Sequence, residues 1–364
     1  MAIANWSFPT NIKFGCGRIS ETGVACEELG ILRPLIVTDK NLAKSQITIN
    51  LQDSLSKSGL KVNTFSEVDS NPNEKNLETG LNYLKEVKAD GILAFGGGSA
   101  IDLAKLLAFM YSQDRPVWDF EDREDWWKRA SGKPTLPVIA IPTTAGTGSE
   151  VGRASVLTDK NSLTKKIIFH PTILPNLVIL DPELTVSMPQ EITAGTGMDA
   201  LAHNLEAYCS ESLHPMAHGI SLEGMRIIFN NLENVYKNPK DLNARGQMMI
   251  SATMGAVAFQ KGLGAIHALS HPIGAKYNCH HGTTNALLIN SALILNKSII
   301  EKKIKAACRY LNFEENFDSF CGKIDQLNSA LNIPINLGAM GIKIDDVQNI
   351  VDKALIDPSA STNP

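Results

Sequence analysis

Residues 91–105 read GILAFGGGSAIDLAK, and this stretch decides the fold of the N-terminal half. A short apolar run is followed at once by three glycines and a serine, and then by a pattern with helical spacing. Continuous apolar runs of this length are typical of strands buried on both faces of a parallel sheet. At such a strand–helix junction the backbone N–H groups and the helix dipole favour a phosphate, and glycines allow its close approach. The stretch therefore predicts phosphate or dinucleotide binding, although a plain tight turn between strand and helix has the same pattern.

The neighbouring segments repeat this strand–helix pattern. Short apolar runs occur at 34–38, 137–141 and 177–180, and residues 76–88 carry leucines at helical spacing with charges on the opposite face. Alternation of strands and helices predicts βαβ units and a doubly wound parallel sheet. We therefore expect a Rossmann-like α/β domain over residues 1–185, which would bind a dinucleotide.

The second half of the chain has a different pattern. The strand signals end near residue 187, and long helical patterns follow at 191–209, 218–236 and 247–260. The boundary is expected between residues 182 and 190. Residues 186–364 are therefore predicted to form an all-helical domain.

Composition excludes several classes of protein. The chain has 364 residues, 43% hydrophobic and 20% charged, with a formal net charge of −4. This balance is typical of a folded protein and lacks the cationic excess of a nucleic-acid binder. No stretch approaches the ~20 apolar residues of a membrane span, and the first residues lack the pattern of a secretory signal. The six scattered cysteines, with no Cys-x-x-Cys pair, favour free thiols and a cytoplasmic protein.

Two further features lie where strands of the predicted sheet end. Asp39 directly follows the 34–38 run, where a carboxylate can accept hydrogen bonds from a ribose diol and repel a 2′-phosphate. That position favours NAD over NADP, while helix capping is an equally good explanation. Residues 142–150, PTTAGTGSE, form a second polar, glycine-containing loop after another strand. Two such loops at one edge of a parallel sheet predict a ligand site there.

Histidines in the second half predict a metal centre. Asp199 and His203 lie four residues apart in a helical pattern, as do His267 and His271, while His280 and His281 follow a short polar stretch. Residues four apart on a helix share one face. These segments are rich in Ala and Gly and nearly free of other charges, so burial of such groups would be costly without a partner. One carboxylate with three imidazoles suits iron or zinc, but spacing alone does not decide which of the later histidines are ligands.

Taken together, these segments resemble the iron-containing alcohol dehydrogenase family, which is built on a dehydroquinate-synthase-like fold. The resemblance runs over nearly the whole chain. It is carried by PTNIKFGCG, VTDK, SNPN, GGGSAIDLAK, PTTAGTGSEV, LPNLVILDPELT, GMDALAHNLEAY, HALSHPIGAKYNCHHG and ALIDPSASTNP. Ordered motifs at family-like spacing are far more specific than any single one of them.

The resemblance implies a role for individual residues. The family's metal ligands fall on Asp199, His203, His267 and His281, and His271 matches a further histidine associated with proton relay. This chain has His280 where the family usually has Pro, so a ligand exchange between His280 and His281 stays open. The positions that match the family's NAD cleft are Asp39, Asn71, Gly97, Gly98, Ser99, Asp102, Thr143, Thr144, Thr147, Ser149 and Lys165.

The resemblance also implies an activity. We expect a metal-dependent NAD(H) oxidoreductase, with Fe²⁺ as the first choice of ion and Zn²⁺ as the second, that interconverts a small primary alcohol, diol or hydroxy acid and its carbonyl product. In that chemistry the ion acts as a Lewis acid and nicotinamide exchanges the hydride. A dehydrogenase of the 4-hydroxybutyrate type is one alternative, and a sugar-phosphate cyclase-like lyase of the same fold is another. A silent binding protein is the third. A homo-oligomer, dimeric or larger, is expected.

Overall fold

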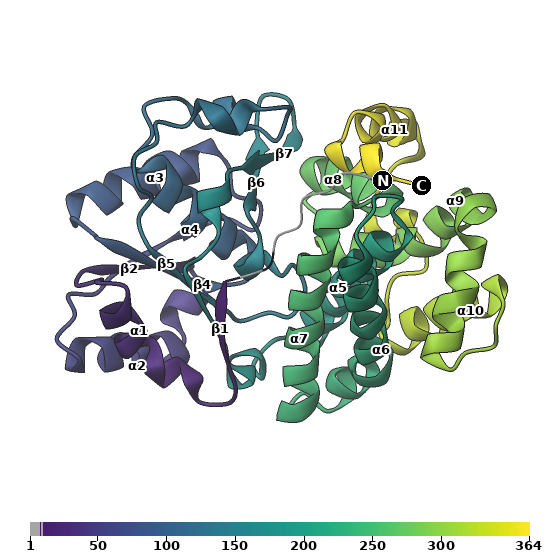
Figure 1. The fold of residues 1–364 in the computed structure, drawn as a ribbon, viewed down its shortest axis with the longest axis horizontal. Coiled ribbons are helices and arrows are strands. Elements are labelled where there is room, and N and C mark those ends of the chain that lie inside the picture. Colours follow the sequence, from purple (N-terminus) through teal and green to yellow (C-terminus); the bar gives the residue numbers. More distant parts are fainter. Residues whose placement is uncertain (1–7, 9) are drawn as a thin grey trace. The chain divides into compact units, whose positions relative to one another are not determined.

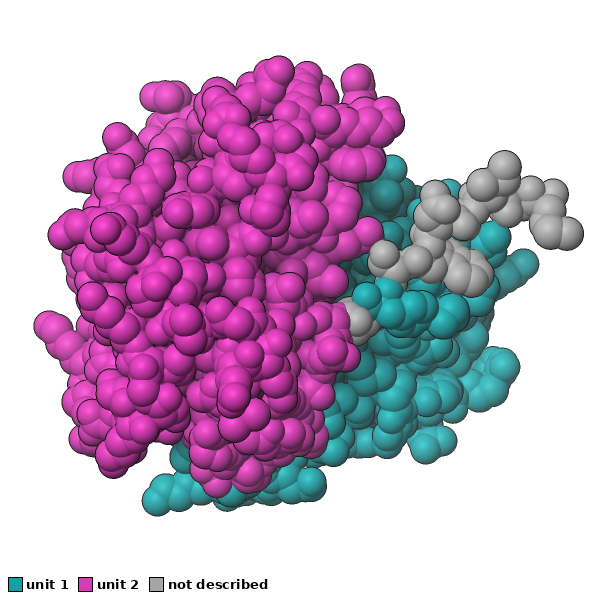
Figure 2. Space-filling view, turned by 60° about the vertical axis from the view of Figure 1, so that its left-hand side comes forward, with its two compact units in different colours: residues 1–8, 145–148, 186–364 teal, residues 9–144, 149–185 magenta. Residues whose placement is uncertain are grey.

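The computed structural model describes residue 8 and residues 10–364, which divide into two compact units (Figure 2). One unit contains residues 10–144 and Ser149–Thr185, and the other contains Ala145–Gly148 and Val186–Pro364. The chain thus passes from one unit to the other between Thr185 and Val186. The Ala145–Gly148 segment belongs to the second unit, although its sequence lies within the α/β half.

The first unit is built on a parallel sheet of six strands, in the order β1-β8-β5-β4-β2-β3 (Figure 1). The apolar runs identified in the sequence correspond to four of these strands. The strands are β1 (Asn11–Phe14), β2 (Pro34–Asp39), β3 (Asn63–Val68), β4 (Gly91–Gly96), β5 (Val138–Pro142) and β8 (Leu177–Leu180). The predicted parallel α/β architecture is confirmed.

Helices cover both faces of this sheet. In Figure 1, α1 and α2 lie on one face and α3 and α4 on the other. On the face covered by α1 and α2, the helix residues Cys26 and Leu55 share one hydrophobic core with strand residues such as Ile36 and Phe95, and all four are fully buried. The central strands β4 and β5 are buried at every position, which explains their unbroken apolar sequence. The bounds are α1 (Thr22–Glu28), α2 (Gln46–Lys57), α3 (Glu74–Glu86) and α4 (Gly98–Met110).

The strand order reverses between β2 and β4. From β2 the chain proceeds to β3 on one side, and it then returns to β4 on the other side of β2. In open α/β sheets, ligands bind beyond the carboxyl ends of the strands at this reversal. The glycine loop after β4 and Asp39 at the end of β2 both lie at that place.

A second, smaller sheet was not predicted from the sequence. Strands β6 (Ala154–Asp159) and β7 (Thr164–Phe169) form an antiparallel hairpin in the same unit. The hairpin is joined to the loop before α3, where the Thr158 N–H donates to the Pro72 carbonyl over 2.8 Å. It is also joined to α4, because the fully buried Lys105 ammonium donates to the carbonyls of Ser149 and Ala154.

The second unit is helical from Val186 onward, as predicted, and none of its described residues forms a strand. Long buried segments rich in Ala and Gly allow its helices to approach closely. No helix in the described part of the chain has the combined length and apolarity needed to cross a membrane. The helices are α5 (Gln190–Cys209), α6 (Pro215–Lys237), α7 (Leu242–Ala258), α8 (Ala265–Tyr277), α9 (His281–Leu311), α10 (Phe317–Ala330) and α11 (Val347–Leu355).

Candidate active site

Helix α5 presents a carboxylate and an imidazole on one buried face. Asp199 and His203 lie four residues apart and are only 2% and 5% exposed. Their neighbours are mostly Ala, Gly, Leu and Thr, so the helix is buried almost completely from Thr193 to Cys209. The predicted pairing of Asp199 and His203 on one face is therefore present. Two ionisable groups in such surroundings need compensating partners.

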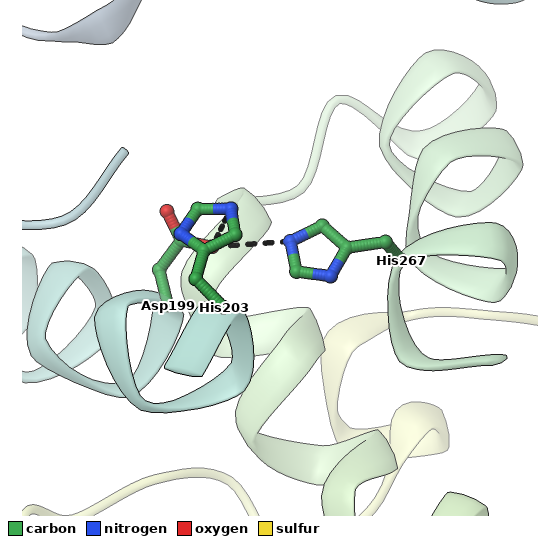
Figure 3. Close-up of side chains that lie close together, drawn as sticks. All are labelled: Asp199, His203 and His267. Atoms are coloured by element: carbon green, nitrogen blue, oxygen red, sulfur yellow. Dashed lines mark ion pairs between the residues drawn. The ribbon is translucent and has the colours of Figure 1, made fainter. Parts of the chain in front are cut away.

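Those partners come from the next two segments of the predicted constellation. His267 lies on α8 and His281 is the first residue of α9. The Nε2 atoms of His203, His267 and His281 lie 3.9, 3.7 and 3.6 Å from the same Asp199 oxygen, Oδ1. Figure 3 shows the side chains of Asp199, His203 and His267 pointing toward one another. Three of the four predicted ligands, the histidines, thus surround one oxygen of the fourth, Asp199.

This arrangement fits a divalent transition-metal ion. Ion–ligand bonds of about 2.0–2.2 Å place tetrahedral donors roughly 3.3–3.6 Å apart, close to the separations observed around Asp199. One donor atom from each of Asp199, His203 and His267 lies within 4.8 Å of the others, and all three residues are buried. The imidazole-rich set with a single carboxylate suits iron or zinc better than magnesium or calcium.

The pKa values of these groups reflect the crowding. Burial alone would raise the pKa of the Asp199 carboxyl, but the surrounding imidazoles lower it well below its ordinary value. Burial lowers the pKa of His203 to about 4, against the opposing effect of Asp199. Burial also acts to lower the pKa of His267, but the carboxylates of Glu206 and Asp199 raise it to about 9. Asp199 is therefore an anion, and His203 is a neutral imidazole with a lone pair to donate.

Two residues that hold the ligands were missed in the sequence. The Nδ1–H of His267 donates to Glu206 Oε2 over 2.5 Å, and Glu206 Oε1 accepts from the Ile266 N–H. The amide nitrogen of Asn285 donates to Asp199 Oδ1 over 2.8 Å and lies 3.3 and 3.2 Å from the Nε2 atoms of His267 and His281. Carboxylates behind ligating histidines fix the ring orientation and tautomer. Glu206, a charged residue in the nearly charge-free segment around His203, carried a signal that could have identified it.

The choice between His280 and His281 follows from the start of α9. His280 is the N-cap, and its Nδ1 accepts a hydrogen bond from the Thr283 N–H over 3.3 Å. His281 is one residue further, with its Nε2 toward Asp199 and its Nδ1 3.4 Å from the Ser270 hydroxyl. His280 is exposed, whereas His281 is partly buried. The geometry therefore favours His281 as the ligand.

This distinction predicts opposite outcomes for two adjacent substitutions. His281→Ala is expected to weaken divalent-ion binding by more than the roughly 10–100-fold that loss of an outer hydrogen-bond partner costs. His280→Ala removes a helix cap and no proposed ligand, so it should lower the free energy of unfolding by about 1 kcal/mol and leave ion affinity within about twofold of the wild type. Competition with a chromophoric chelator measures the affinity, and urea denaturation measures the stability. Equal ion loss in both variants would contradict the assignment.

His271, the residue matched to proton relay, lies beside this cluster without belonging to the Asp199 contacts. Its ring is stacked on His281 with ring centroids 5.6 Å apart and an interplanar angle of 13°. Its Nδ1 is 2.8 Å from Asp357 Oδ2, a contact that the sequence patterns gave no reason to expect. Asp357 belongs to ALIDPSASTNP, one of the motifs that carry the family resemblance, and the sequence predicts no role for it.

The predicted cofactor residues gather mostly at one edge of the six-stranded sheet. Gly97 and Gly98 begin α4 directly after β4, and Thr143 and Thr144 follow β5. The Thr143 N–H donates to the Gly96 carbonyl over 3.0 Å, and the Ser99 hydroxyl donates to the Ser70 carbonyl over 2.6 Å. These bonds connect the loops that follow β3, β4 and β5. Asn71 lies in the first of these loops.

Glycine is required at the end of β4. Gly96 has φ +147°, and a Cβ added there would lie 2.9 Å from the Ala100 Cβ. The backbone can therefore enter α4 directly at this point only without a side chain. Gly97, the N-cap, likewise has no side chain over the first backbone N–H groups of the helix. Such an opening suits a phosphate.

Asp39 caps the turn that follows β2. Its Oδ1 accepts hydrogen bonds from the N–H groups of Asn41 and Leu42, over 2.9 and 3.0 Å. This is the capping role that the sequence predicts as the alternative to ribose binding. The carboxylate is nevertheless held at the carboxyl end of β2, so the two roles are compatible.

Asp102 and Ser149 are engaged with each other. The Ser149 hydroxyl donates to Asp102 Oδ1, while Asp102 Oδ2 accepts from the Val156 N–H over 3.1 Å. Asp102 also forms an ion pair with Lys105 at 3.4 Å. Burial lowers the pKa of Lys105, against the opposing effect of Asp102. In the structure, Asp102 thus fastens the segment after Gly148 to α4.

The remaining two cofactor candidates, Thr147 and Lys165, belong to other parts of the fold. Thr147 belongs to the Ala145–Gly148 segment of the helical unit. Lys165 is on β7, paired in register with Thr158 of β6. Its neighbour Lys166 forms an ion pair with Asp159 at 2.9 Å.

Comparison with known proteins identifies the family of this chain. The model of the iron-containing alcohol dehydrogenases matches residues 9–182, and that of the C-terminal region of the Fe-containing alcohol dehydrogenase family matches residues 193–364. A 4-hydroxybutyrate dehydrogenase of Cupriavidus necator is 34% identical over 98% of this chain and 94% of its own length.

Solved structures show the same likeness. A 1,3-propanediol oxidoreductase matches with a TM-score of 0.93 and 30% identity, covering 100% of this chain and 96% of its own. A sulfoacetaldehyde reductase of Bifidobacterium kashiwanohense, solved in complex with NAD⁺, matches with a TM-score of 0.89 and 27% identity, covering 100% and 95%. The family models together span nearly the whole chain, including every residue of the Asp199 cluster. The chain belongs to the iron-containing alcohol dehydrogenase family.

Proposed function

We propose that this protein is an NAD-dependent dehydrogenase with a resident divalent ion, and that it interconverts a small primary alcohol, diol or hydroxy acid and the corresponding carbonyl compound. The observation that carries the proposal is the convergence of three imidazole Nε2 atoms, within 3.6–3.9 Å, on one oxygen of Asp199. Membership of a dehydrogenase family favours this reading over a lyase or a silent binding protein.

Asp199, His203, His267 and His281 would hold the ion. When bound, a divalent ion supplies Lewis-acid chemistry that makes the proton of an alcohol more acidic. Glu206 fixes His267 with Nδ1 as its donor and so directs Nε2 toward Asp199. Asn285 restrains Asp199 from the other side through its amide N–H. His271 then serves as the general base that takes the proton from the substrate.

We propose iron as the ion that the protein holds in the cell, with zinc as the alternative.

NAD is the proposed cofactor, and it would supply the hydride acceptor. The glycine opening after β4 would take the phosphates, and Asp39 at the end of β2 would face the ribose diol. Support for NAD comes also from the sulfoacetaldehyde reductase, which was solved with NAD⁺ bound. Asn71, Ser99, Thr143 and Thr144 lie in the connected loops of the same sheet edge and are proposed to complete the site.

The substrate is proposed within a narrow chemical range. The 4-hydroxybutyrate dehydrogenase and the 1,3-propanediol oxidoreductase among its relatives support short hydroxy acids and diols, respectively. The guanidinium carbon of Arg153, which follows the 142–150 loop, lies 5.5 Å from the centre of the Phe169 ring, and its charge interacts with Asp122. A carboxylate-binding role for Arg153 is therefore not part of the proposal.

The setting is proposed to be a homo-oligomer in the cytoplasm. All six cysteines are free, three of them buried, and burial raises the pKa of the Cys26 and Cys209 thiols to about 12. Thiols of this kind are inert and persist in a reducing compartment.

The proposal predicts ion-dependent formation of NADH. The purified protein is stripped with a chelator and reloaded with Fe²⁺ or Zn²⁺ in separate samples, and NADH absorbance is followed with primary alcohols, diols and 4-hydroxybutyrate. We expect activity to fall at least tenfold on stripping and to return with one of the ions. NADP run in parallel should be the poorer cofactor, because Asp39 repels a 2′-phosphate. Full activity in the stripped, ion-free protein would overturn the proposal, and equal use of NADP would remove the role of Asp39.

A further inference from the structure

We propose that Asp357 is a positioning residue for His271, which holds the imidazole as the Nδ1–H tautomer and thereby leaves the Nε2 lone pair to accept the proton of the alcohol. This inference rests on the proposed function of the site and adds to it a residue that lies 86 positions further along the chain. It is carried by the geometry of the His271–Asp357 pair and by the way the segment around Asp357 is fastened.

The pair is close and buried. Asp357 Oδ2 lies 2.8 Å from His271 Nδ1, and the two side chains are only 7% and 9% exposed. Burial alone would raise the pKa of Asp357, but hydrogen bonds from His271 and Ser359 lower it below its ordinary value. The carboxylate is therefore ionised and can only accept, so the ring nitrogen that faces it carries the proton. Of the two neutral tautomers, only the one with Nδ1–H satisfies this contact.

The carboxylate itself is held in place. Its second oxygen, Oδ1, accepts from the Ser359 N–H over 2.9 Å and starts a 3₁₀ helix at Pro358–Thr362. At the other end of that helix the Thr362 hydroxyl donates to the Leu263 carbonyl over 2.8 Å. Both oxygens of Asp357 are thus used, one by the turn and one by the imidazole.

The same segment also fastens the helix that carries His271. Asn363 Oδ1 accepts from the N–H of Ala265, the first residue of α8, over 2.9 Å. It accepts as well from the Asn296 amide of α9. The segment that carries Asp357 is therefore hydrogen-bonded to Leu263 and Ala265, just before and at the start of α8. The fold thus sets the separation between Asp357 and His271.

The position of the ring suits a proton acceptor. His271 lies one helical turn after His267 on α8, with their ring centroids 5.9 Å apart, and it is stacked on His281. His271 thus lies beside two proposed ion ligands, but it is not one of the three histidines whose Nε2 atoms surround Asp199 Oδ1. A base held here would meet an alcohol that occupies the same centre.

The proton step balances with the proposed reaction. The O–H bond of the alcohol would break and an N–H bond would form at His271 Nε2, while bound NAD⁺ would supply the acceptor for the hydride, which carries the electron pair of the adjacent C–H bond. The products are the carbonyl compound, NADH and an imidazolium ion whose charge is stabilised by Asp357. The imidazolium then releases its proton to water.

The first test measures the tautomer and needs no variant. NMR of protein labelled with isotopic nitrogen at histidine distinguishes Nδ1–H from Nε2–H rings, and we expect His271 of the wild type to be Nδ1–H. In Asp357→Asn the amide can donate to Nδ1, so the ring is expected to shift toward Nε2–H. Asp346→Asn is the matched control, because Asp346 binds another α8 side chain, Lys276, and should leave the His271 ring unchanged. A wild-type Nε2–H ring would overturn the proposal.

The second test is a double-mutant cycle in the ion-loaded enzyme. Asp357→Asn is expected to lower kcat about 10–100-fold, with the KM values for NAD and alcohol and the ion affinity within about twofold of wild type. Because Asp357 acts through His271, it should have almost no further effect in the His271→Ala background. Equal losses in both backgrounds would indicate a merely structural role and refute the inference. If the wild-type protein oxidises no alcohol at all, the proposed function fails, and the NMR result still decides the tautomer.

Discussion

Replacing Asp199 by asparagine is expected to weaken divalent-ion binding by roughly 10²–10⁴-fold and to abolish ion-dependent activity with it. The substitution keeps the shape of the side chain and an oxygen for the Asn285 amide, but it removes the single anion on which three Nε2 atoms converge. Loss of one partner from a buried charged set costs about 3–5 kcal/mol, which is the origin of the expected factor. Three imidazoles without a carboxylate would also face a divalent cation with no compensating charge.

Ion content after dialysis and affinity by chelator competition measure this effect. Asp318→Asn is the matched control, since Asp318 is 87% exposed on α10 and should bind the ion as the wild type does. Thermal denaturation of the stripped proteins confirms that both variants fold. An Asp199→Asn protein that retains the ion at wild-type affinity would show that the carboxylate is not a ligand.

Gly282→Ala is expected to cause the largest loss of stability of any single methyl group added to the helical unit. A Cβ at Gly282 would lie 2.0 Å from the Gly195 carbonyl oxygen and 3.0 Å from the Asp199 Cβ. The clash is with backbone, so α5 and α9 must separate. Overpacking usually costs 1–3 kcal/mol and sometimes more, and we expect about 3 kcal/mol here, or roughly 6–12 °C in Tm. Because Asp199 and His281 sit on the two helices at this contact, the ion affinity should fall as well.

A glycine elsewhere in the same unit gives the control. Gly322, within α10, has no atom within 4 Å of an added Cβ, so Gly322→Ala should be neutral or should stabilise the protein by up to about 1 kcal/mol. Thermal scans of the two variants, with and without added ion, measure the difference. A Gly282→Ala protein as stable as Gly322→Ala would mean that α5 and α9 do not approach as closely as described.

The strands that the sequence pattern predicted are those buried inside the sheet. β2, β4, β5 and β8 have continuous apolar sequences because both of their faces are covered. β1 and β3 were missed because they are the two edge strands, and polar residues such as Asn11, Lys13 and Glu67 interrupt their apolar sequence. The β6–β7 hairpin was missed for a similar reason, since it lies outside the main sheet and much of it is only partly buried.

Spacing along the chain predicted the pairs of site residues but not their surroundings. A four-residue separation was enough to place Asp199 and His203 on one face of α5. The choice between His280 and His281 depends on the residue at which α9 begins, which local sequence leaves open. The pairing of Glu206 with His267 and of Asp357 with His271 was not predicted, because these partners lie 61 and 86 positions apart and only the tertiary fold brings them together.

The cap that Asn363 places on α8 affects how the protein is made. Asn363 is added to the growing chain 98 residues after Ala265, whose N–H it binds. At about 5–20 residues per second, a ribosome needs roughly 5–20 s for that interval. During this time α8 and its two histidines have been synthesised but lack the cap, and Asp357 has also not been added for most of the interval. We therefore expect the ion to be captured stably only after translation has passed Asn363, so that metal loading follows synthesis instead of accompanying it.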